Sequence, residues 1–134
     1  MNILIIEKSK TISHILKNTL VAYGYNVTQD TADFSSENLV DRGLFEILIL
    51  DTNITGKYTT LDILKKVKGK KDVKTKILGI CSMGIWKDKV NFLNTGGDDV
   101  LSYPFPVQEL IARIQSLLRR PNSYVDSRMY IGEI

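Results

Sequence analysis

Short apolar runs alternate along the chain with longer stretches in which apolar residues recur every three or four positions. The runs predict buried strands, and the longer stretches predict helices that cover them. Three of the runs are almost unbroken Ile, Leu and Val, which is typical of strands covered on both faces of a parallel sheet. We therefore expect strands over Asn2 to Ile6, Tyr25 to Thr28, Glu46 to Asp51, Lys76 to Cys81 and Val100 to Tyr103.

Apolar residues at helical spacing follow the first, third and fifth of these strands, around Leu16, Leu64 and Ile114. Weaker patterns predict two more helices, over Ser35 to Arg42 and over Trp86 to Thr95, each followed by a glycine that can end a helix. Strands that alternate with helices in this way indicate an α/β fold with a doubly wound parallel sheet.

The chain has 134 residues, of which 43% are hydrophobic, so it is the size of one domain with a single core. We expect residues 1–120 to form that domain. Residues 121–134 are polar and turn-rich and finish with Tyr-Ile-Gly-Glu-Ile, which has no predicted strand left to pair with. This tail is expected to be a linker toward a C-terminal domain that is not present in this chain.

Charge and cysteine content narrow the class of protein further. The formal charge is +3, and a lysine-rich stretch around Lys70 lacks interleaved aromatic residues, which favours a solvated surface over direct DNA contact. The lone Cys81 excludes an internal disulfide and offers no zinc-binding spacing. No apolar run approaches the roughly 20 residues that span a bilayer, and the first residues lack a signal-peptide pattern. We expect a cytoplasmic protein without a membrane partner.

Polar residues stand where the predicted strands end. In a doubly wound sheet, ligand sites lie outside the carboxyl ends of the strands. A carboxylate that closes the run Ile-Leu-Ile-Leu is costly to bury unless it is partnered, which singles out Asp51. The other polar residues expected at this edge are Glu7, Lys8, Cys81, Ser82, Ser102 and Tyr103.

Three segments carry a resemblance to a known family: NILIIEKS, FEILILDTNITG, and TGGDDVLSYPF followed by ELIARIQSLLRR. In this order and spacing they resemble bacterial response-regulator receiver domains, over about residues 2–120. The nearest subfamily is the winged-helix (OmpR/PhoB-like) one, in which a segment like YIGEI opens the next domain. The resemblance implies a flavodoxin-like, five-stranded sheet of order 2-1-3-4-5 with five helices. It also implies a regulatory rather than enzymatic role, a histidine kinase as a partner, and DNA binding through the missing C-terminal domain.

The family's phosphorylation chemistry is only partly present. The resemblance makes Asp51 the aspartate that accepts a phosphoryl group. The family binds magnesium with two acidic residues after the first strand, whereas this chain has Glu7 and Lys8, and an ammonium repels a cation. A lysine that holds the phosphoryl group is replaced by Tyr103, which carries no charge. We therefore expect magnesium binding to be weak or absent and no other cofactor.

Further positions of the resemblance depart from the family pattern. The hydroxyl residue that ends the fourth strand aligns with Cys81, although a shift of one residue would supply Ser82. The aromatic switch residue of the fifth strand aligns with Val100, which cannot perform the same rotation. The loop after the third strand has Thr55 where proline is common, and Thr59 where a glycine is expected. These replacements predict a degenerate phosphorylation site.

Three interpretations of that site remain open. In the first, Lys8 forms a fixed ion pair with Asp51, and the site is held together without metal or phosphate. In the second, Lys8 points to solvent and Asp51 is a hydrogen-bonded cap. In the third, Asp51 is still phosphorylated, inefficiently, by a kinase whose own groups compensate.

The subfamily dimerises through its fourth helix, fifth strand and fifth helix, using a small apolar patch ringed by ion pairs. The chain retains both parts, which predicts a homodimer that forms without phosphate. The alternative is that the apolar residues belong to the core and the charged ones form ordinary helix-surface pairs. The expected interface residues are Lys89, Val90, Leu93, Asp98, Asp99, Glu109, Ile111, Arg113 and Arg120.

Two other classes of function compete with a receiver domain of a transcription regulator. A small enzyme on this fold is disfavoured because the chain has no GxGxxG after the first strand and no P-loop glycine spacing. A stand-alone signalling adaptor without a DNA-binding domain is the more serious alternative. Coding sequence beyond Ile134 with a helix-turn-helix pattern would decide between the adaptor and the transcription regulator.

Overall fold

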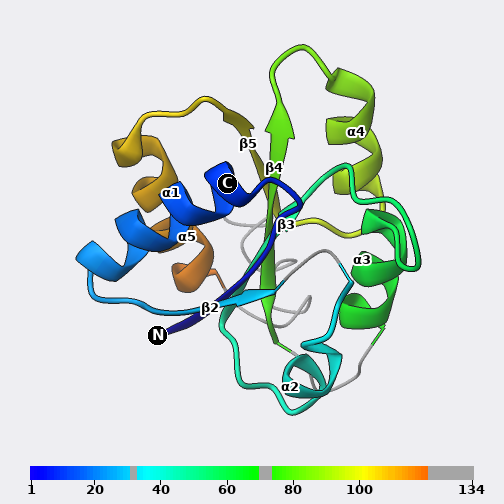
Figure 1. The fold of residues 1–134 in the computed structure, drawn as a ribbon, viewed down its shortest axis with the longest axis horizontal. Helices are drawn as coiled ribbons and strands as arrows, with labels where there is room; N and C mark the ends of the chain where they lie inside the picture. Colours follow the sequence, from blue (N-terminus) through cyan, green and yellow to red (C-terminus); the bar gives the residue numbers. More distant parts are fainter. Residues whose placement is uncertain (31–32, 70–73, 121–134) are drawn as a thin grey trace, which may run out of the picture.

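A computed structural model describes residues 1–30, 33–69 and 74–120, and the predicted linker at 121–134 lies outside them. Five strands and five helices alternate along the chain (Figure 1). The strands are β1 (Asn2–Ile6), β2 (Asn26–Asp30), β3 (Ile47–Asp51), β4 (Lys76–Ser82) and β5 (Asp99–Tyr103). The helices are α1 (Lys10–Ala22), α2 (Glu37–Asp41), α3 (Thr60–Lys68), α4 (Trp86–Asn94) and α5 (Val107–Arg119).

The strands form one parallel sheet in the order β2-β1-β3-β4-β5. This confirms the predicted doubly wound, five-stranded flavodoxin-like architecture. Figure 1 shows α1 and α5 on one face of the sheet and α3 and α4 on the other. The strand order reverses beside β1, so the carboxyl ends of β1 and β3 open the crevice where such folds bind ligands.

The alternation of side chains along the strands builds two separate apolar layers. Leu4, Leu48 and Leu50 pack into the layer that includes α3 and Phe92 of α4. Their neighbours in the sequence point to the opposite face, where Ile3, Ile47 and Ile49 pack against α1 and α5. All five residues of β3 are buried, because this central strand is covered on both faces.

The predicted boundaries of β1 agree with the structure, whereas those of β2 are shifted. β2 runs from Asn26 to Asp30 because it pairs in register with all of β1 from Asn2 to Ile6. The polar residues Gln29 and Asp30 gave no apolar signal for that extension, since β2 is an edge strand. The other strands differ from the prediction by one residue at one end, which is the usual uncertainty of such boundaries.

The second helix is shorter than the sequence pattern predicts. It spans only Glu37–Asp41, because the two serines before it are used by Asp30. The Ser35 hydroxyl donates to Asp30 Oδ1 at 2.9 Å, and the Ser36 N–H donates to Oδ2 at 2.9 Å. These bonds fix a turn between β2 and α2 and delay the start of the helix.

Side-chain caps set the start of the helices that lie near the carboxyl edge of the sheet. Ser9 caps α1 by accepting the N–H of Ile12 at 3.2 Å. Thr59 and Asp62 form a reciprocal capping box at the start of α3. The residue at position 59 is thus a helix cap in this chain. Within the described residues, no helix is both long enough and apolar enough to cross a bilayer.

Candidate functional site

A cavity of about 230 Å³ opens at the carboxyl edge of the sheet. It is lined by the ends of β1, β3, β4 and β5 and by the first turn of α4. It therefore brings together most of the side chains that the sequence singled out at strand ends. These are Glu7, Lys8, Asp51, Cys81, Ser82 and Tyr103.

Asp51 closes β3 as a buried, hydrogen-bonded carboxylate. Its Oδ1 accepts the N–H of Asn53 at 2.9 Å, and its Oδ2 accepts the backbone N–H of Lys8 at 3.4 Å. The side chain therefore ties the loop after β3 to the loop after β1. These contacts agree with the interpretation of Asp51 as a cap.

The expected ion pair between Lys8 and Asp51 is wrong. The Lys8 ammonium instead donates to the backbone carbonyl of Asn53, with an Nζ–O distance of 2.8 Å. Among the described residues, no salt bridge joins Lys8 to Asp51. The physical reason is that Asp51 is buried and already accepts backbone N–H groups. The exposed Lys8 side chain keeps its ammonium at the rim of the cavity, where it reaches the Asn53 carbonyl.

Glu7 is a buried carboxyl group directly beside Asp51. Its Oε2 accepts the N–H of Ser9 at 2.9 Å, while Oε1 is buried and faces no donor. The pKa of Glu7 is raised to about 8, mainly by burial and also by its interaction with Asp51. The bond from the Ser9 N–H and the charge of Lys8 lower this pKa by less. At neutral pH Glu7 is therefore mainly protonated, which removes one negative charge from beside Asp51.

The wall formed by β4 and β5 carries no positive side chain among the residues that line the cavity. The Tyr103 ring packs edge-on against Phe105, with 5.7 Å between the ring centroids. Cys81 is buried, with its Sγ 3.5 Å from the Ser102 hydroxyl, whereas Ser82 is exposed and lies opposite Tyr103 in the register. Both candidates for the hydroxyl position thus line the cavity, so the register leaves that assignment open.

Val100 does not line the cavity. Its side chain is buried in the apolar layer that contains Phe92. The cavity is also lined by residues that the sequence did not single out, among them Ile12 of α1 and Ile85 and Asp88 at the start of α4. The acidic residue in the first turn of α4 was the only sequence signal for Asp88.

The residues of this cavity do not fit the magnesium ion that the family resemblance implies. Mg²⁺ needs oxygen ligands in near-octahedral geometry. Here an ammonium is already bonded to the carbonyl oxygen of Asn53, and no group of three or more His, Cys, Asp or Glu side chains in the described part of the chain is placed to hold a metal. A unit positive charge placed about 4 Å from an ammonium has an unfavourable interaction energy of roughly 4 kcal/mol at an effective dielectric of 20.

Comparison with known proteins identifies the family. The model of the response regulator receiver domain matches residues 3–115. The chain belongs to this family. The doubly wound sheet and the buried aspartate at the end of β3 are thus features of a receiver domain.

Curated relatives of this receiver domain include two named regulators. The chain is 28% identical over 134 residues to the transcriptional regulatory protein TctD of Salmonella typhimurium (strain LT2), covering 100% of this chain and 59% of TctD. It is 32% identical over 137 residues to the cell cycle response regulator CtrA of Brucella ovis, covering 100% of this chain and 57% of CtrA. The chain therefore spans somewhat more than half the length of these relatives.

Solved structures with the same fold include full-length FixJ from B. japonicum, at a TM-score of 0.80 and 24% identity, over 99% of this chain and 64% of FixJ. A receiver domain protein from Clostridium thermocellum gives a TM-score of 0.77 at 20% identity, over 89% of this chain and 94% of that one. At this level of identity the likeness shows the fold alone.

The apolar part of the predicted dimer face is only partly at the surface of the receiver domain. Val90 and Leu93 on α4 are 42% and 44% exposed, and Trp86, one turn before Val90, is 64% exposed. Ile111 was expected to join this patch, and that expectation is wrong. It is only 6% exposed and packs in the layer between the sheet and α5, because it follows the buried Leu110 on the inner side of the helix.

The charged residues of the predicted face pair mainly within the chain. Arg113 donates to both oxygens of Asp99 at 3.0 Å and to Glu109 at 2.8 and 3.1 Å. Asp98 accepts the ammonium of Lys68 at 2.7 Å, and its carbonyl accepts Arg120 at 2.9 Å. Lys89 is half-buried on α4. These contacts match the alternative of ordinary helix-surface pairing, and a second chain would meet a face whose charges are already paired.

Proposed function

We propose that this chain is the regulatory receiver domain of a DNA-binding transcription regulator of the winged-helix subfamily, and that it works without phosphorylation of Asp51. The observation that carries the proposal is the bond from the Lys8 ammonium to the Asn53 carbonyl at 2.8 Å. A side-chain cation thereby joins the loops after β1 and β3, beside the carboxylate that a kinase would have to modify.

The rest of the cavity supports this proposal. A phosphoryl group on Asp51 would displace the N–H donors of Asn53 and Lys8 and would bring about two negative charges beside Glu7 and Asp88. The position that holds the phosphoryl group in the family is occupied here by the uncharged Tyr103. Only Lys8 offers a positive charge among the residues that line the cavity.

We infer that the output is self-association through α4, β5 and α5. Three exposed apolar side chains at helical spacing, Trp86, Val90 and Leu93, support a contact that buries this side of α4. A symmetric dimer would hold two attached DNA-binding modules at adjacent half-sites and raise their effective concentration. The relatives' printed names and the additional length of those proteins support such a module after residue 134, in a cytoplasmic regulator.

The test is sedimentation equilibrium of the chain with and without Mg²⁺ and a small acyl phosphate donor. We expect the same dimer population in all conditions, and the same again for Asp51→Asn. Leu93→Glu should weaken the dimer by about tenfold or more, because it places a charge in the apolar contact. A monomer that dimerises only after phosphorylation of Asp51 would overturn the proposal and restore a conventional receiver with a histidine kinase.

A further inference from the structure

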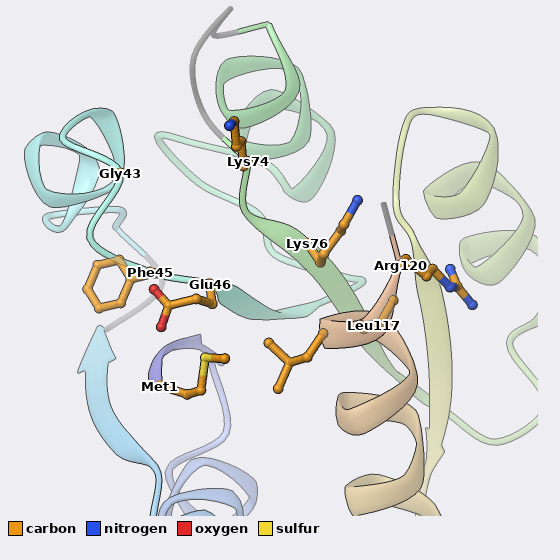
Figure 2. Close-up of a pocket in the computed structure, with 9 residues that line it drawn as sticks. Met1, Gly43, Phe45, Glu46, Lys74, Lys76, Leu117 and Arg120 are labelled. Atoms are coloured by element: carbon orange, nitrogen blue, oxygen red, sulfur yellow. The ribbon is translucent and has the colours of Figure 1, made fainter. Parts of the chain in front are cut away.

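A second cavity lies at the opposite end of the sheet from Asp51. Its volume is about 330 Å³, and it opens between the residues that precede β1 and β3, the start of β4 and the end of α5 (Figure 2). None of its residues takes part in the carboxyl-edge site or in the predicted dimer face except Arg120. This cavity is therefore a separate feature of the domain.

One side of the cavity is apolar. Phe45 and Leu117 are buried core residues whose surfaces reach the cavity, and Leu118 is half-buried beside them. Figure 2 shows Leu117 at the end of α5 and Met1 on the neighbouring side of the cavity. The thioether of Met1 is 58% exposed and can adapt its shape to a ligand. A flat aromatic or aliphatic group would remove this surface from water.

The other side is positively charged. It carries Lys74, Lys76 and Arg120, against a single carboxylate, Glu46. Glu46 already accepts the backbone N–H of Asn2 at 2.7 Å. Arg120 is held in place by its bond to the Asp98 carbonyl at 2.9 Å, which uses one of its five N–H donors.

The charge balance at Lys76 agrees with this description. Burial lowers the pKa of Lys76, and the charges of Lys68 and Arg120 lower it further, while Asp98 acts in the opposite sense. Lys76 therefore lies near two other positive side chains, which repel it, and near the Asp98 carboxylate, which offsets part of that repulsion. An anion in the cavity would relieve that repulsion.

We propose that this cavity binds a small organic anion, whose apolar or aromatic body packs against Phe45 and Leu117 and whose phosphate or carboxylate group bonds Lys74, Lys76 and Arg120. The volume lies at the lower end of the roughly 300–1,000 Å³ that is typical of small-molecule sites. The concave shape and the apolar side favour such a ligand over a DNA duplex, which would need only a convex basic surface. Leu117 and Leu118 belong to the last turn of α5 and Arg120 caps it, so the ligand would contact the end of this helix.

The site can be tested with three matched probes: phenyl phosphate, inorganic phosphate and phenol. Two-dimensional NMR of the ¹⁵N-labelled chain follows the amides of Gly43, Phe45 and Leu118 beside the cavity and that of Asp51 at the other end. We expect phenyl phosphate to shift the first three amides and to bind about tenfold more tightly than either fragment, because only it uses both sides of the cavity. The Asp51 amide should not move.

Each of two single substitutions of exposed residues, Lys74→Glu and Arg120→Glu, should weaken phenyl phosphate binding by at least about fivefold. Lys17→Glu is the control, since it makes the same charge change on the exposed side of α1. Circular dichroism checks that each variant folds. This readout is independent of phosphorylation and dimerisation, so its failure would leave the proposed function intact.

Three results would overturn the inference. The first is equal affinity for phenyl phosphate and for the better of its two fragments. The second is a loss of affinity in Lys17→Glu as large as that in the cavity variants, because the effect would then be one of net charge. The third is displacement of phenyl phosphate by a short DNA duplex that binds more tightly, which would make this end a nucleic-acid surface instead.

Discussion

The carboxyl-edge cavity and the exposed side of α4 differ in what they leave without a partner. In the cavity, Lys8 is bonded to a carbonyl, Asp51 takes two backbone donors, and Glu7 is mainly protonated at neutral pH. On α4, two apolar side chains, Val90 and Leu93, remain more than 40% exposed. The charged groups of the first region are held without an added ion, whereas the second region exposes apolar surface. This difference supports the proposal that a second chain binds at α4 and that no ion is needed beside Asp51.

The proposed difference between the two regions can be tested most directly by removing the cation from the cavity. Lys8→Asp replaces an ammonium with a carboxylate next to Glu7 and Asp51 and frees the Asn53 carbonyl. We expect Mg²⁺ affinity to rise by about 100-fold or more, because a repulsive charge becomes a ligand. Quenching of the single Trp86 by Mn²⁺ can measure the binding, since its neighbour Ile85 lines the cavity.

Lys10→Asp is the matched control for this experiment. It makes the same charge change two residues away, at the exposed start of α1, and Lys10 is not among the residues that line the cavity. We expect its Mg²⁺ affinity to stay within about threefold of the parent chain. A parent chain that binds Mg²⁺ as tightly as Lys8→Asp would show that the ammonium moves aside at no cost.

The alternation of apolar runs was sufficient to predict the class of fold. Strands such as β1 and β3 are buried on both faces, so their sequences are almost entirely Ile and Leu and are easily recognised. The edge strand β2 was misplaced because its exposed side chains carry no such signal. Most of the polar residues that the sequence singled out at strand ends do line the cavity, since the carboxyl ends of parallel strands meet at one edge. The lining residues from the loops and from α1 and α4 were not predicted.

The contacts within the site could not be predicted in the same way. Charge alone suggested that Lys8 bonds Asp51, but the outcome depends on a backbone carbonyl, that of Asn53, which no sequence pattern reveals. Ile111 was assigned to the surface because the family resemblance places it in the dimer patch, although its helical spacing with Leu110 and Ile114 is that of a buried residue. Neighbouring residues such as Leu110 and Ile111 are both buried here, since α5 lies close against the sheet.

The proton on Glu7 gives a second test, with a smaller effect. The unfolded state loses this proton near pH 4.5, whereas the folded state holds it up to about pH 8. The folded parent chain therefore loses stability as the pH rises from about 4.5 to about 8, and Glu7→Gln does not. After allowance for screening by solvent in an open cavity, we expect the variant to gain about 2 kcal/mol at pH 8 and almost nothing at pH 4.5.

Urea denaturation of both chains at several pH values measures this difference. Glu46→Gln is the control, since Glu46 lies at the far end of the sheet, in the amino-end cavity. A gain for Glu7→Gln that is the same at every pH would mean that packing, and not the proton, distinguishes the variant. Protonation of Glu7 beside Asp51 would then not account for the difference in stability.

The smallest expected effect concerns the surface formed by α4, β5 and α5. It distinguishes the charged side chains, which stabilise the fold, from the apolar ones, which are proposed to form the dimer contact. Arg113 already bonds Asp99 and Glu109 within the chain, so Arg113→Met should lower the free energy of unfolding by about 1 kcal/mol. Because its donors are committed, the same change should alter dimer dissociation by less than about threefold. Leu93→Glu should behave in the opposite way, with a weaker dimer and little change in unfolding.

Urea denaturation and sedimentation equilibrium measure the two quantities, and Arg119→Met, at the exposed end of α5, is the control. If Arg113→Met weakened the dimer as much as Leu93→Glu, its guanidinium would have to leave Asp99 for a carboxylate of the second chain. The charged residues would then need a partner as much as the apolar ones do. Only the Lys8 and Asp51 side chains of the carboxyl-edge cavity would then have their partners within a single chain.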